Sequence, residues 1–319
     1  MRLEKIAAPP ERFTGTSRLK LPTPVRTAAR RTLVLAFLLA LCAGCKTISI
    51  AEKNLLPKTP DPTDAPSIET ALAGADVQLR VHQIAAFDGT LLHAAQVIRD
   101  PSYPTVLYFG GNVSRVSREL PMLVKETEGM GVNLLMTDHR GNGRSAGESS
   151  MLTHYHDGLA AYDFAHKELG IAAERMVVHG MSMGSIKASY VALHRPVAGL
   201  VLEGSVSTAE EWVDSYVPWF MKPFLRVELA DSLRGQGALW AVKHQSAPLL
   251  VIVGSKDSQT PPVLSKQLFE AAKQAGYPAE LLIVPGAGHG NAMSAEQTQQ
   301  QYLKWLAGLF PGAHKVAVR

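Results

Sequence analysis

Hydrophobic and polar residues alternate in two neighbouring segments, Val77–Phe87 and Leu91–Ile98, which are joined by a turn at Asp88-Gly89. A period of two is typical of a strand with one buried face, so we expect an antiparallel pair here. Six shorter apolar runs follow, at residues 105–109, 132–137, 175–179, 199–203, 248–253 and 279–284.

Segments of helical length separate most of these runs. They are Glu119–Met130, Tyr155–Leu169, Ser185–His194, Pro262–Ala275 and Ala295–Leu309. An antiparallel start followed by alternating strands and helices implies a doubly wound sheet. The pattern therefore predicts an α/β fold with a mostly parallel, eight-stranded sheet and helices on both faces.

Residues 180–184 read Gly-Met-Ser-Met-Gly, between an apolar run and a predicted helix. In this context a G-x-S-x-G sequence forms a sharp turn that lifts the serine hydroxyl clear of the sheet. Both glycines are needed because side chains there would collide with the neighbouring strand and helix. Ser182 is therefore the candidate nucleophile.

A candidate acid and a candidate base follow Ser182, each just past a predicted strand. Asp257 follows the run 248–253, and His289 lies between glycines after the run 279–284. His289 would take the serine proton and pass it to the leaving group, while Asp257 would orient the imidazole. Ser182, Asp257 and His289 are the predicted catalytic triad.

Other titratable residues lie near the same predicted strands. Glu203 is the alternative acid, because it ends a predicted strand. His179 precedes the serine turn and is expected to pack in or beside the strand. The loop histidines His139, His154 and His156 have no companion carboxylates at zinc-ligand spacing, so we predict no metal site.

Two further motifs carry a family resemblance. A Gly-Gly-Asn loop, residues 110–112, follows one strand, and Asp138-His-Arg-Gly-Asn-Gly-Arg-Ser145 follows another. Together with the triad order, they make residues 77–310 resemble the α/β-hydrolase superfamily, in the neighbourhood of protein depalmitoylases and lysophospholipase-like enzymes. Gly110 stands where many relatives carry histidine. Asp138 and Arg140 are expected to buttress the site rather than to act in it.

The resemblance implies an α/β-hydrolase fold, a serine hydrolase activity and no cofactor. It also favours Asp257 over Glu203, because a Gly-x-x-Asp loop followed by Pro-Pro is the usual site of the acid. The backbone N–H groups of Asn112 and Met183 would form the oxyanion hole. A plain strand-ending turn is the alternative interpretation of the Gly-Gly-Asn sequence.

The least regular part of the chain is residues 205–246. It is rich in aromatic residues, namely Trp212, Tyr216, Trp219, Phe220 and Phe224. In the family this excursion forms a small lid segment, where an aromatic surface could line an acyl pocket. A helix that packs its apolar face on the sheet would show the same composition, and the two interpretations stay open.

The amino terminus resembles a bacterial lipoprotein signal. Basic residues precede the apolar stretch Leu33–Leu41, and Cys42-Ala-Gly-Cys45 follows. The apolar core is too short for a transmembrane helix. Residues 1–44 are therefore the predicted signal peptide, with lipidation at Cys45. An uncleaved helical anchor is the alternative.

Charge is concentrated in this leader. Residues 1–44 hold eight of the 32 Lys and Arg residues but two of the 28 acidic ones, so the remainder carries a small net negative charge. No nucleic-acid partner is expected. The Pro-rich residues 45–75 are predicted to be a tether, and residues 76–312 the hydrolase domain. By resemblance to Gram-negative lipoproteins, Lys46 after the cysteine favours the periplasmic face of the outer membrane.

The sequence thus predicts a lipid-anchored serine hydrolase of the bacterial cell envelope. It would cleave carboxylic ester or thioester bonds in small-molecule or lipid substrates through an acyl-enzyme intermediate. A serine peptidase or an acyltransferase on the same fold is the alternative enzyme, and a non-catalytic ligand-binding lipoprotein is the alternative outside catalysis. The oligomeric state is left open.

Overall fold

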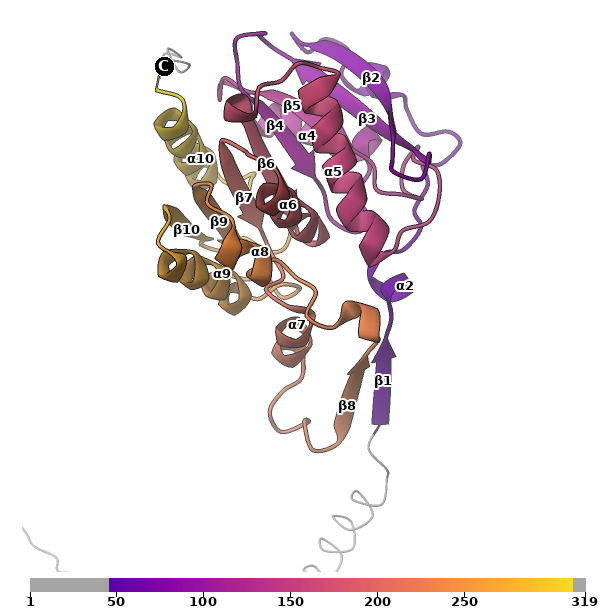
Figure 1. The fold of residues 1–319 in the computed structure, drawn as a ribbon, viewed down its shortest axis with the longest axis vertical. Coiled ribbons are helices and arrows are strands. Elements are labelled where there is room, and N and C mark those ends of the chain that lie inside the picture. Colours follow the sequence, from indigo (N-terminus) through magenta and orange to yellow (C-terminus); the bar gives the residue numbers. More distant parts are fainter. Residues whose placement is uncertain (1–45, 312–319) are drawn as a thin grey trace, which may run out of the picture. The chain divides into compact units, whose positions relative to one another are not determined.

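The computed structural model describes residues 46–311, and its central feature is an eight-stranded sheet (Figure 1). The strands lie in the order β10-β9-β7-β6-β4-β5-β3-β2. The pairs β2–β3 and β3–β5 are antiparallel, and the other pairs are parallel. The fold class predicted from the sequence is confirmed. The strands are β2 (Gln78–Ala85), β3 (Leu91–Ile98), β4 (Thr105–Phe109), β5 (Asn133–Thr137), β6 (Met176–Met181), β7 (Gly199–Glu203), β9 (Leu249–Gly254) and β10 (Ala279–Val284).

Helices cover both faces of this sheet. Along β4, Val106 and Tyr108 join one apolar cluster while Leu107 and Phe109 join the other, as the alternation of side chains in a strand requires. Because both faces are covered, the central strands are apolar throughout. One face carries α3 (Ile68–Ala71), α4 (Val116–Glu126) and α10 (Glu296–Leu309), and the other carries α5 (Met151–Lys167), α6 (Met183–His194), α8 (Leu239–His244) and α9 (Pro262–Ala275).

Helix α5 begins four residues before the predicted start. Ser150 caps it, because the Ser150 hydroxyl accepts the Thr153 N–H at 3.2 Å and the Thr153 hydroxyl accepts the Ser150 N–H at 2.8 Å. This reciprocal capping satisfies two backbone donors at the helix start. His154 and His156 therefore lie on a helix and not in a loop.

The Pro-rich segment differs from the expected tether, since residues 47–75 pack on the hydrolase domain. Ile68 is fully buried in the core cluster of one sheet face. Thr59 exchanges backbone hydrogen bonds with Gly141 and Gly143 at 3.1 and 3.0 Å. Apolar residues on either side of the prolines, Leu56 before them and Ile68 after them, supply the burial that an extended linker lacks. The predicted signal peptide and Cys45 lie outside the described residues.

The segment between β7 and β9 carries the elements that lie near the serine turn. It contains α7 (Ala209–Tyr216), β8 (Leu225–Leu229), the 3₁₀ turn η2 (Asp231–Leu233) and α8. Strand β8 pairs with β1 (Lys46–Ile50), which is followed by α2 (Glu52–Leu55). A second 3₁₀ turn, η1 (Ala173–Arg175), precedes β6.

Candidate active site

Ser182 lies in a strained turn between β6 and α6. Its backbone has φ 52° and ψ −120°, and no other non-glycine residue in the described part of the chain has a positive φ. A side chain at Gly180 would overlap with the Gly184 carbonyl, and one at Gly184 would overlap with the Phe109 carbonyl. The sequence G-x-S-x-G is therefore required by close backbone approach, and the strain presents the hydroxyl at the end of the sheet.

Asp257 and His289 form a hydrogen-bonded pair. His289 Nδ1–H donates to Asp257 Oδ2 at 2.9 Å, and the other carboxylate oxygen accepts the N–H groups of Gln259 and Thr260 at 2.9 and 2.8 Å. Burial acts to raise the pKa of Asp257, but the bonds from His289 and Thr260 outweigh it and hold the pKa below 3.8. With Nδ1 protonated, His289 Nε2 presents a lone pair and can act as a base.

Ser182 and His289 line the same cavity. No hydrogen bond joins their side chains, although both are described. Such bonds are often long before substrate binds and tighten in the complex. The structure thus brings all three predicted triad residues to one end of the sheet, with the acid–base pair already formed.

The predicted oxyanion hole lies beside Ser182. Neither Asn112 N–H nor Met183 N–H donates to an acceptor within the part of the chain that the structure describes, and Met183 is the first residue of α6, where backbone donors have no partner in the helix. Their carbonyls are held from behind: Asn142 Nδ2 donates to Asn112 O at 2.7 Å, and His154 Nε2 donates to Met183 O at 3.1 Å. The two free donors are therefore fixed in place.

Gly110, where relatives carry histidine, is supported by a histidine from another segment. A Cβ at Gly110 would overlap with the Ser114 side chain. His139 Nε2 donates instead to Gly110 O at 2.9 Å, and its Nδ1 accepts a hydrogen bond from Lys187 Nζ at 2.8 Å. Burial and the nearby Lys187 charge lower the pKa of His139 to about 3, so this histidine is neutral.

Lys187, His139 and His154 form a buried polar cluster behind the oxyanion loop that the sequence analysis missed. His139 and His154 lie with ring centroids 5.0 Å apart, and burial lowers the pKa of Lys187 to about 8. The available signal was a lysine in a predicted helix that has no other Lys, Arg, Asp or Glu residue. Its meaning depends on residues from three segments meeting in space.

The alternative acid, Glu203, forms an ion pair with His179 and not with His289 among the described residues. Its carboxylate lies 3.4 Å from His179 Nε2, and both side chains are buried. Its backbone carbonyl accepts the Ser182 N–H at 2.8 Å. His179 packs between Tyr108 and Tyr302, in agreement with a role in packing.

Asp138 and Arg140 hold the neighbouring loops together. Asp138 accepts hydrogen bonds from His93 Nδ1 at 2.8 Å and from Val116 N–H at 2.6 Å, which ties β3 to the start of α4. Arg140 forms ion pairs with Asp157 and Asp88 at 2.8 and 2.7 Å. Neither side chain lines the cavities at Ser182, so the geometry fits the buttressing role.

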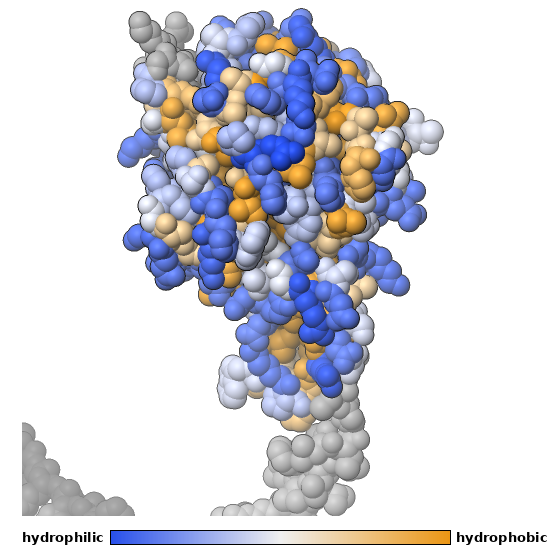
Figure 2. Space-filling view, viewed as in Figure 1, coloured by the Kyte–Doolittle hydropathy of each residue, from blue (hydrophilic) through white to orange (hydrophobic). Residues whose placement is uncertain are grey.

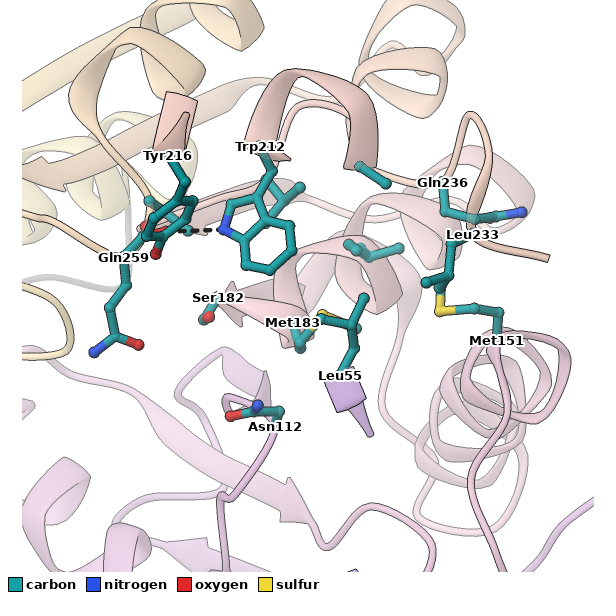
Figure 3. A pocket seen from close by; sticks show the side chains of 14 residues that line it. Leu55, Asn112, Met151, Ser182, Met183, Trp212, Tyr216, Leu233, Gln236 and Gln259 are labelled. Carbon is teal, nitrogen blue, oxygen red and sulfur yellow. Dashed lines mark hydrogen bonds between the residues drawn. The ribbon is translucent and has the colours of Figure 1, made fainter. Parts of the chain in front are cut away.

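A mainly apolar cavity opens at Ser182 (Figure 3). Helix α7 forms one wall, where Trp212 Nε1 and the Tyr216 hydroxyl both donate to Gln259 O at 2.9 and 2.6 Å. Leu55 of the N-terminal segment also reaches the cavity, a contribution that no local pattern indicated. Other apolar lining residues are Met151, Met183, Ile186, Val206 and Leu233. The aromatic helix therefore lines a pocket.

Ser182 also lines a second cavity. Its lining includes His289 and three carboxylates, Glu119, Glu126 and Glu203. Burial raises the pKa values of Glu119 and Glu126. Within residues 46–311, no group of three or more His, Cys, Asp and Glu side chains is arranged to hold a metal ion.

A serine on a strained turn, a histidine paired with an aspartate and free amide donors beside them define a serine hydrolase of the α/β-hydrolase type. The chain belongs to the prolyl oligopeptidase family, which residues 129–311 match. An uncharacterized protein of Mycobacterium tuberculosis is 27% identical over 259 residues, covering 81% of this chain and 88% of that protein. The alpha/beta hydrolase domain-containing protein WAV2 of Arabidopsis thaliana is 27% identical over 197 residues, which cover 58% of this chain and 64% of that protein.

Solved structures share the fold at lower identity. An esterase from Pyrococcus furiosus superposes with a TM-score of 0.61 at 19% identity, covering 78% of this chain and 98% of its own. An acylaminoacyl peptidase from Pyrococcus horikoshii gives a TM-score of 0.56 at 16% identity, covering 77% of this chain and 43% of its own. The fold is thus found in an esterase and in a peptidase.

Proposed function

We propose that this protein hydrolyses carboxylic esters or thioesters through Ser182, His289 and Asp257. The observation that carries the proposal is the apolar cavity that opens at Ser182 beside the free amides of Asn112 and Met183. Such a cavity suits an acyl chain whose carbonyl carbon lies at the serine.

The reaction proceeds by an acyl-enzyme. Ser182 Oγ attacks the carbonyl carbon while His289 Nε2 takes the hydroxyl proton, and the two amides stabilise the resulting oxyanion. His289 returns the proton to the leaving alcohol or thiol as that bond breaks. Water then attacks the acyl-enzyme, giving its proton to His289, and the carboxylic acid leaves as the proton returns to Ser182. Asp257 stays ionised and stabilises the imidazolium.

Peptide bond cleavage is the second candidate. The family match and the acylaminoacyl peptidase with the same fold favour it. Its chemistry differs in the leaving group, because an amine must be protonated before it departs. An acyltransferase differs only in the final step, where another nucleophile replaces water.

The test uses p-nitrophenyl esters of increasing acyl length, an acylated amino-acid p-nitroanilide and a fluorophosphonate label. Ser182→Ala should abolish turnover and labelling. Ser189→Ala is the matched control, since it removes a buried hydroxyl from the same helix without touching either cavity. Ester turnover that rises with acyl length supports the proposal, and faster anilide cleavage favours the peptidase. A folded protein with neither turnover nor labelling would support the non-catalytic alternative.

We further propose that cleavage before Cys45 and acylation of that cysteine attach the protein to the bacterial cell envelope, with the periplasmic face of the outer membrane favoured. The basic, apolar and small-residue order of the leader supports this. In the described residues, no helix is long and apolar enough to cross a membrane. Cys45→Ser should abolish incorporation of labelled palmitate, whereas the control Cys42→Ser should retain it.

A further inference from the structure

The connection between α7 and β8 exposes a cluster of large apolar side chains. Trp219 is 82% exposed and Phe220 58%, although the two rings pack edge to face with centroids 6.0 Å apart. Together with Tyr216, Met221 and Phe224, which are exposed by 41 to 47%, they form what we call the α7–β8 surface. Exposed aromatic residues gathered on one loop are unusual on a protein that is surrounded by water.

This surface lies where the described chain begins. Ile50 O at the end of β1 accepts the N–H of Ala230, just past the end of β8, at 2.9 Å. The two strands therefore run parallel, and their first residues lie at the same end of the small sheet (Figure 1). Phe224 immediately precedes β8, and β1 begins one residue after Cys45.

Charged residues around the α7–β8 surface do not form a basic patch. Lys222 pairs with Asp214, and Arg226 pairs with Glu228 at 3.2 Å. In the part of Figure 2 that corresponds to β1, β8 and their connections, hydrophobic side chains show between hydrophilic ones. Acidic neighbours therefore offset the attraction of these basic side chains to anionic groups. Burial of the aromatic rings is the main favourable contribution to binding a partner at this surface.

The exposed area favours a lipid surface over a second copy of the chain. Aromatic side chains bury about 150–250 Å² each. Five half-exposed side chains of this size therefore offer roughly 500 Å². A stable protein interface needs about 800 Å² from each partner. Tryptophan and tyrosine also prefer the boundary between lipid headgroups and acyl chains, because their rings are apolar with one polar group.

We propose that the α7–β8 surface inserts into the interfacial region of a phospholipid bilayer, at the end of the small sheet where β1 and β8 begin. The neighbouring Trp212 and Tyr216 of α7 and Leu55 after β1 all line the apolar cavity. Insertion therefore brings this cavity close to the bilayer and gives it access to membrane-resident acyl esters. The contact extends the proposed membrane attachment and does not rest on catalysis.

The test reads the position of Trp219 directly. The full chain is reconstituted with phosphatidylcholine vesicles whose acyl chains are either plain or brominated, because bromine quenches tryptophan emission only at close range. The chain has four tryptophans, and Trp240 on α8 is 59% exposed but lies outside the α7–β8 surface. Trp219→Phe and the matched control Trp240→Phe both keep an aromatic ring, so neither should disturb folding.

We expect brominated vesicles to quench the parent protein and the Trp240→Phe variant. Trp219→Phe should lose most of that quenching, and added phosphatidylglycerol or salt should change the result little. Equal quenching of the parent and Trp219→Phe would overturn the proposal, as would a chain that stays in solution. Blue-shifted Trp219 emission without quenching would also overturn it, because the leader or a second copy would then cover the surface. Ser182→Ala in the same vesicles separates this contact from catalysis, and Cys45→Ser separates it from acylation, because quenching reports only the position of the tryptophan rings.

Discussion

Replacing Lys187 by methionine tests the buried cluster behind the oxyanion loop. Lys187 is 1% exposed, and its ammonium group donates to His139 and lies 5.4 Å from the Phe109 ring centroid. No carboxylate lies within ion-pair distance of it among the described residues. Burial is the largest cause of its lowered pKa; the charge of Arg140 also lowers the pKa, while that of Asp157 raises it. Methionine has a similar shape and no charge.

The size of the effect on the free energy of unfolding follows from the pKa of Lys187. It falls from 10.5 to about 8 on folding. One pH unit of difference corresponds to about 1.4 kcal/mol, so burying the charged form costs about 3 kcal/mol relative to burying the neutral amine. Below pH 8 the lysine is charged in both states and this cost is fully present. Between pH 8 and 10.5 Lys187 is protonated in the unfolded chain but loses its proton in the folded one, so the free energy of unfolding increases as pH rises.

Lys187→Met should remove this pH dependence. At pH 7 it relieves the cost of the buried charge, but it leaves His139 Nδ1 without a donor, which costs about 1–3 kcal/mol. The net change at pH 7 is therefore small. The difference in unfolding free energy between parent and variant should shift by about 3 kcal/mol in favour of the parent from pH 7 to 10.5.

The assay is urea unfolding of residues 46–319 across this pH range, with the exposed Lys266→Met as control. Groups shared by parent and variant cancel in the difference. We also expect kcat to fall with little change in KM, because His139 positions the Gly110 carbonyl. A pH-independent difference in unfolding free energy would refute the buried-cation reasoning, and an unchanged kcat would refute the positioning role.

Three further predictions concern the site. Asp257→Asn should lower kcat by about 10⁴ without unfolding the protein, because an amide cannot hold the imidazole in the required tautomer; a loss of less than tenfold in ester turnover would contradict this role. Gly184→Ala should destabilise the protein by about 1–3 kcal/mol or more in urea unfolding, because its Cβ overlaps with the Phe109 carbonyl. The control Gly308→Ala, in open space on α10, should stabilise it by up to about 1 kcal/mol. Trp212→Ala should lower kcat/KM for long acyl esters by about tenfold, or 1.4 kcal/mol, and affect short ones less; an unchanged length profile would show that the cavity does not hold the acyl chain.

Much of the fold was predictable because its signals are local. The strands Leu91–Ile98, 105–109, 199–203 and 279–284 were placed at their observed bounds, since a short apolar or alternating run marks a buried strand. The helix Pro262–Ala275 was also placed at its observed bounds, with proline at its start and the left-handed Gly276 at its end. The positions of the serine turn and of the loops after β9 and β10 followed from the same local patterns.

Other features required contacts between distant segments. The pairing of β1 with β8 joins residues near 50 with residues near 230, and neither strand has a local pattern that selects the other. The expected tether folds onto the domain for the same reason, because Ile68 finds its apolar contacts only in the assembled core. Helix α5 begins earlier than predicted because its start is set by the reciprocal hydrogen bonds of Ser150 and Thr153, whereas the prediction relied on the spacing of apolar residues.

The sequence alone determined the fold class and placed the candidate nucleophile, acid and base in order, because each depends on residue type and spacing close to a strand end. Tertiary structure decided which acid meets His289, how His139 and Lys187 support a loop that lacks its usual histidine, and which residues wall the cavity at Ser182. Hydrogen bonds and apolar contacts act over a few ångströms, so their partners are set by how the chain folds back on itself and not by distance along it.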